Sequence, residues 1–175
     1  MRIVSLWVSA VFLALLAAAY AGAEGVRHYE DGLQLAGTIQ LEEVEGRIDH
    51  MAASPDGRQL FVAALGSNMV EKIDTRQRTI VGNIHGIKEP HGLGYIPKSN
   101  RLVVASGGDG NVRIYDQDLK PVGWVNSLED ADNVRYDPAQ DLFYVGYGQG
   151  SLAIIDPTKS VKIAEIPLDG HPESF

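Results

Sequence analysis

The stretch "RIDHMAASPDGRQLFVAALG" (residues 47–66) has the pattern of a β-hairpin, and similar stretches begin near Glu89 and Ala131. The repeat is therefore about 41 residues long, a period typical of architectures built from one recurring unit. Each copy opens with a polar residue, continues with a proline-centred turn, and then enters an apolar strand. These opening residues are His50, His91 and Asn133.

Four short apolar segments make up each copy. Their strands are rich in Val, Ile, Leu, Tyr and Phe, and Gly, Pro, Asn and Asp separate them, which is the pattern of antiparallel hairpins. A four-stranded unit of about 40 residues is typical of a β-propeller blade. The sequence predicts an all-β protein whose blades cover residues 46–86, 87–128 and 129–168. One blade cannot bury both of its faces, which explains why the unit is repeated.

An aspartate ends the third strand of every copy, at Asp74, Asp116 and Asp156. A carboxylate in this position can accept hydrogen bonds from the backbone of the turn that follows. We therefore predict a structural role for these three residues.

The two ends of the chain hold incomplete units. Residues 24–45 include "LQLAGTIQL" (33–41), which we expect to form a strand that closes the last blade, as propellers do to remove an exposed edge. Residues 169–175 read as the start of a fourth copy, with Glu173 at the position of His50. Since a propeller needs at least about four blades, we expect the sequence to be the N-terminal part of a longer protein.

The first 23 residues have the pattern of a secretory signal peptide. An uncharged apolar run from Ile3 to Tyr20 ends in small residues that fit a cleavage site after Ala23. The alternative is an uncleaved membrane anchor, because 18 apolar residues are just long enough to span a bilayer. The expected location is periplasmic or secreted.

Composition excludes several function classes. The formal charge is −8, and lysine and arginine are scattered singly, so nucleic acid is not an expected partner. The chain has no cysteine, which excludes disulfides, zinc–thiolate sites, iron–sulfur clusters and thiol nucleophiles.

The aligned copies resemble the YVTN, or YncE-like, family of bacterial propellers. The resemblance rests on "LFVAALGSNMVEKID", "RLVVASGGDGNVRIYD" and "LFYVGYGQGSLAIID", and it covers about residues 44–175. It implies an exported ring, usually seven-bladed, without an established catalytic activity. It implies nothing specific about chemistry, because a fold does not fix a function.

Blade symmetry places the opening residues around the axis, at an axial mouth. The candidate ligand-binding residues there are His50, His91, Asp132, Asn133 and Glu173, and Asp49 is expected beside them. Concave polar mouths are common ligand sites. An alternative is that these side chains only hydrate a channel.

Two functions follow from this mouth. The sequence favours an exported binding module for a small molecule or a protein partner, with no catalytic residue identified. The alternative is a calcium-dependent, lactonase-like hydrolase, because Asp132, Asn133 and Glu173 offer the oxygen ligands that calcium prefers. A bound divalent cation is the cofactor that this alternative requires, and imidazoles at the same mouth would suit zinc, copper or iron instead.

Overall fold

The computed structural model describes residues 34–173 and 175, and twelve β-strands lie in this part of the chain. The predicted signal peptide, residues 1–23, falls outside the described residues. None of the described residues belongs to a helix that could cross a lipid bilayer.

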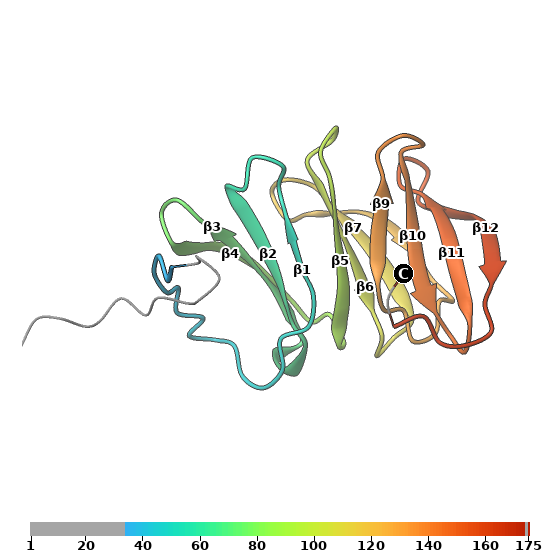
Figure 1. Ribbon diagram of the computed structural model, residues 1–175, viewed down its shortest axis with the longest axis horizontal. Helices are drawn as coiled ribbons and strands as arrows, with labels where there is room; N and C mark the ends of the chain where they lie inside the picture. Colours follow the sequence, from blue (N-terminus) through green and yellow to red (C-terminus); the bar gives the residue numbers. More distant parts are fainter. Residues whose placement is uncertain (1–33, 174) are drawn as a thin grey trace, which may run out of the picture. The chain divides into compact units, whose positions relative to one another are not determined.

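Three four-stranded antiparallel sheets follow one another along the chain (Figure 1). The first blade contains β1 (Met51–Ala53), β2 (Gln59–Ala64), β3 (Met69–Asp74) and β4 (Thr79–His85). The second contains β5 (Pro90–Ile96), β6 (Arg101–Ser106), β7 (Asn111–Tyr115) and β8 (Pro121–Val125). The third contains β9 (Val134–Asp137), β10 (Leu142–Tyr147), β11 (Ser151–Asp156) and β12 (Val161–Pro167).

Strands pair in sequence order within each sheet, so every blade is a meander. In each blade the pairing of the third and fourth strands shifts register once, at Lys72/Ile73, Ile114/Tyr115 and Ile154/Ile155. A bulge repeated at the same place increases the local twist of each outer edge. The prediction of an all-β protein with three complete blades is confirmed.

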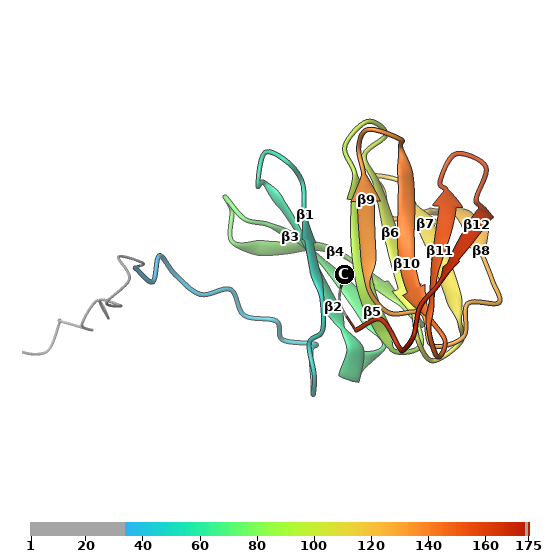
Figure 2. The ribbon, with the colours of Figure 1, turned by 45° about the vertical axis from the view of Figure 1, so that its right-hand side comes forward.

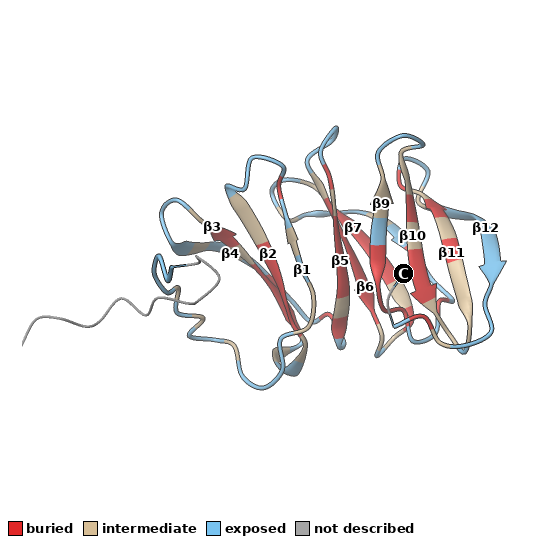
Figure 3. Ribbon diagram, viewed as in Figure 1, coloured by how far each residue is buried: buried red, intermediate tan, exposed pale blue. Residues whose placement is uncertain are grey.

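The middle blade packs against both neighbours. Figure 2 shows the three sheets in a view turned by 45° from that of Figure 1. In β6, Leu102 and Val104 pack with Phe61 of the first blade, whereas Val103 and Ala105 pack with Phe143 of the third. Because successive strand residues face opposite sides, one fully apolar strand serves two cores. The outer strand β12 is exposed along its whole length (Figure 3).

The strand predicted over residues 33–41 is not formed where the structure describes it. Residues 35–41 have no regular secondary structure, and Leu33 is outside the described residues. A strand persists only where a neighbouring strand satisfies its backbone groups, and residues 35–41 pair with none of the twelve described strands. The last blade, with which this strand is predicted to pair, is not among the three described sheets, so its closing role stays a prediction.

Candidate functional site

The segment that leads into each blade is held at the same end of the molecule by a repeated backbone hydrogen bond. Gly66, Gly107 and Gly148 donate their N–H groups to the carbonyl oxygens of Arg47, Glu89 and Glu129. Each glycine belongs to the turn between the second and third strands of its blade. The entry segments and these turns therefore surround one region, as the sequence indicates.

Gly92 allows the entries of the second and third blades to approach closely. A Cβ atom at this position would lie 2.0 Å from the carbonyl oxygen of Asp132 and 2.9 Å from the backbone nitrogen of Val134. Glycine is required here for space and not for an unusual φ angle. This approach brings His91 of β5 next to Asp132, which comes just before β9.

All five predicted site residues gather here, together with Asp49 and His171. We call these seven residues the entry cluster: Asp49, His50, His91, Asp132, Asn133, His171 and Glu173. They come from the entries of three blades and from the segment that follows β12. The cluster therefore combines residues up to 124 positions apart in the sequence, from Asp49 to Glu173.

His91 lies between two carboxylates. Its Nδ1 atom is 2.9 Å from Oδ2 of Asp49 and 3.5 Å from Oδ1 of Asp132. Neither contact is aligned for a hydrogen bond, so we treat both as ion pairs. The contact with Asp132 raises the pKa of His91, although burial opposes this. Burial by itself would raise the pKa of Asp132, but the nearby imidazoles outweigh burial and lower it.

Asn133 connects the first blade with the segment after β12. Its side-chain nitrogen donates to the carbonyl oxygen of Glu173 at 2.9 Å and lies 3.3 Å from Nε2 of His50. Its side-chain oxygen accepts from the guanidinium of Arg135, which fixes the orientation of the amide. Nε2 of His50 is therefore the acceptor, and the ring proton is on Nδ1.

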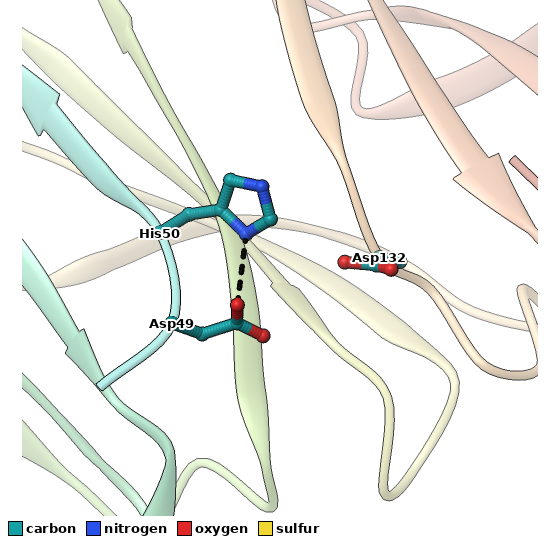
Figure 4. Close-up of side chains that lie close together, drawn as sticks. All are labelled: Asp49, His50 and Asp132. Atoms are coloured by element: carbon teal, nitrogen blue, oxygen red, sulfur yellow. Dashed lines mark ion pairs between the residues drawn. The ribbon is translucent and has the colours of Figure 1, made fainter. Parts of the chain in front are cut away.

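Asp49, His50 and Asp132 converge in the close-up of Figure 4. Each offers one polar atom, and these atoms all lie within 4.8 Å of one another. Nδ1 of His50 faces Oδ1 of Asp49 at 3.4 Å. The Nδ1–H group of His50 therefore faces the Asp49 carboxylate.

His171 is the member that the sequence prediction missed. Its Nδ1 atom contacts the carbonyl oxygen of Gly148, and its Nε2 atom is 3.8 Å from Oδ2 of Asp132. The Gly148 carbonyl raises the pKa of His171. The signal was present, because His171 is two residues before Glu173, in the segment that reads as another blade entry.

Three buried polar atoms of the cluster have no hydrogen-bond partner in the described part of the chain. They are Nδ1 of His50, Nδ1 of His91 and Oδ1 of Asp132. Buried polar atoms are nearly always paired, so an unpaired group is a feature of sites that take a ligand, an ion or water. The Asp132 residue is 7% exposed, which makes its unpaired oxygen the most unusual of the three.

Two hollows of the described surface lie away from the entry cluster. One of about 260 Å³ is lined by turn residues such as Ser54, Pro97 and Gln117, and one of about 190 Å³ by Lys98, Asp141 and Thr158. They repeat between successive blades and hold no cluster of imidazoles. We give more weight to the entry cluster, because convergent, unpaired buried groups are the stronger indication of a site.

Comparison with solved structures identifies a propeller relative. The chain is similar to hydrazine synthase of Kuenenia stuttgartiensis, a β-propeller-containing protein, with a TM-score of 0.67 and 21% identity. The match covers 78% of this chain and 41% of the other, so this chain spans less than half of that protein. The described chain consists of propeller blades. This likeness shows the fold alone, and neither a family model nor a curated protein matches the chain.

Proposed function

We propose that the protein is an exported, periplasmic binding module of the YVTN type, and that the entry cluster is its ligand-binding axial mouth. The observation that carries the proposal is the set of three unpaired buried atoms at the point where three blade entries meet. A ligand that offers acceptors to the two imidazole nitrogens and a donor or positive group to the Asp132 oxygen would satisfy them. The ligand is a small molecule or a protein, and the acidic charge of the chain disfavours nucleic acid.

Export is supported by the apolar N-terminal run and its small-residue end. Fractionation of cells that produce the full-length protein tests it. The expected result is a periplasmic protein whose N-terminal residue is Glu24. A membrane-bound protein that retains residues 1–23 would support the anchor instead.

No contact in the cluster favours the calcium-dependent lactonase. Calcium requires six to eight oxygen ligands, and the side-chain oxygen of Asn133 already accepts from Arg135. We therefore propose binding without catalysis.

The histidine ring signals in NMR spectra test the binding role directly. We would add small-molecule and macromolecular fractions of a metal-free periplasmic extract to the labelled full-length protein. The expected result is that the rings of His50, His91 and His171 shift, whereas that of His85, an exposed residue at the end of β4, does not. If neither fraction shifts any of the three rings, the proposed binding role is wrong.

A further inference from the structure

We propose that Asp132, His171 and Glu173 bind one divalent transition-metal ion. Each residue offers one ligand atom, and the three atoms lie within 4.8 Å of one another. The inference deepens the proposed binding role and rests on it, because it names a metal ion as a ligand of the same mouth. Three features support it: the orientation of the His171 ring, the burial of the Asp132 carboxylate and the anchoring of the segment that carries Glu173.

His171 turns its Nε2 atom toward the site. A carbonyl oxygen can only accept a hydrogen bond, so Nδ1 donates to Gly148 and is occupied by that contact. Nε2, which lies 3.8 Å from Oδ2 of Asp132, is the ring atom that a metal ion would contact. In a metal-binding histidine, the ring nitrogen that does not bind the metal usually donates to a backbone carbonyl or a carboxylate. This hydrogen bond fixes the tautomer and the orientation of the ring.

Asp132 supplies a buried carboxylate. Its Oδ1 atom has no hydrogen-bond partner and is in ion-pair contact with His91, whereas Oδ2 lies 3.8 Å from Nε2 of His171. That distance is too long for a hydrogen bond. It is shorter than the sum of one Zn–N and one Zn–O bond, each of about 2.0–2.2 Å, so one ion can contact both atoms.

Glu173 is brought to the site by the segment that carries it. Its backbone carbonyl accepts from Asn133, and Pro172 packs so closely on Gly146 that a Cβ atom there would lie 2.8 Å from the proline ring. The segment is therefore tied to the third blade by the two residues that follow His171. The Glu173 carboxylate adds a second negative charge to that of Asp132, which favours a divalent cation over a neutral ligand.

The neighbouring set of Asp49, His50 and Asp132 is less suitable. Asn133 holds His50 with its proton on Nδ1, the atom that faces Asp49. Binding a metal through that nitrogen would require the ring to change tautomer and lose the contact with Asn133. His171 needs no such change.

The donor set indicates the class of metal. One imidazole nitrogen and two carboxylate oxygens suit zinc, iron, manganese or cobalt, and there is no thiolate to select a softer ion. Three protein ligands leave one position of a tetrahedral site open. A ligand of the module with an oxygen or nitrogen donor could occupy it, which links the metal to the binding role.

Zinc titration of the full-length protein, in competition with a chromophoric chelator, tests the inference. We expect one equivalent of zinc to bind. Asp132→Asn and His171→Gln each alter a proposed metal ligand. Loss of a group that only orients a ligand costs about 10- to 100-fold in metal affinity, so each variant should weaken zinc binding at least about 10-fold. The matched controls are Asp169→Asn and His85→Gln, which remove the same groups from exposed positions and should leave the affinity unchanged.

Cobalt(II) provides a readout that a general loss of stability would not imitate. The visible absorption of bound cobalt should report a four-coordinate site in the wild type and should be lost in His171→Gln. His171→Gln should leave the fold intact, because His171 lies outside the twelve described strands and its side chain is partly exposed. No zinc binding by the wild type, or equal affinity in all four variants, would overturn the metal site. Histidine shifts with the metal-free extract would still support the binding role in that case.

Discussion

The close approach at Gly92 predicts a large effect for a very small change, Gly92→Ala. The added methyl group would lie 2.0 Å from the Asp132 carbonyl oxygen, whereas real Cβ atoms essentially never come closer than 3.0 Å. The entry of β9 must therefore move by about 1 Å, a backbone shift typical of overpacking. Overpacking costs about 1–3 kcal/mol, and we expect the upper end because the obstruction is backbone. For a domain of about 150–250 residues that corresponds to a melting temperature about 6–12 °C lower, and the shift is smaller in a longer chain.

Differential scanning calorimetry of the full-length protein measures this change, with Gly170→Ala as the control. A Cβ at Gly170 would meet nothing within 4 Å, so the control should stay within about 0.5 kcal/mol of the wild type. A Gly92→Ala protein that melts at the wild-type temperature would refute the close packing of β5 against the entry of β9. It would also remove the basis for placing His91 beside Asp132.

Three further predictions concern single contacts. Hydrogen bonds from turn amides lower the pKa of Asp74, so its carboxylate stabilises the fold above its ordinary pKa, and this contribution is lost as the pH falls through the lower folded value. Asp74→Asn should therefore lower the melting temperature at neutral pH, and the difference from wild type should narrow in acid. Burial and the hydrogen bond to Asp141 raise the pKa of Tyr136 to about 12. In the Asp141→Asn variant, spectrophotometric titration should give a lower pKa for Tyr136. An unchanged pKa would contradict the contact. Gly107→Ala would place a Cβ atom 2.9 Å from the ring of His91. The NMR signals of the His91 ring should therefore shift. Unshifted signals would show that the ring does not lie beside Gly107.

The turn aspartates show what the sequence could predict. Asp74, Asp116 and Asp156 each accept two backbone N–H groups from the turn that follows, as expected from their position. This prediction needed only local information, because the donors lie two to four residues beyond the acceptor. The blades were predictable for a similar reason, because the two strands and the turn of each hairpin are consecutive in the sequence.

The entry cluster was predictable in position and not in chemistry. Blade equivalence indicated that His50, His91 and Asn133 lie near one another, and they do. It could not indicate which atoms pair, because pairing depends on side-chain rotamers and on residues from other positions of the repeat. Arg135 and His171 are such residues. Arg135 sets the orientation of the Asn133 amide, and His171 completes the proposed metal site.

The variation among equivalent positions has a physical reason. If all four positions held imidazoles or all four held carboxylates, their lone pairs or charges would repel one another. The free energy of repulsion would grow with each added copy. An amide can donate and accept at the same time, so Asn133 at the third entry can receive Arg135 on its oxygen while its nitrogen serves both His50 and Glu173. The histidines and acids on either side are then free to interact with each other and with a ligand. The repeated fold thus supplies equivalent places around one mouth, and its chemistry arises because the residues in those places differ.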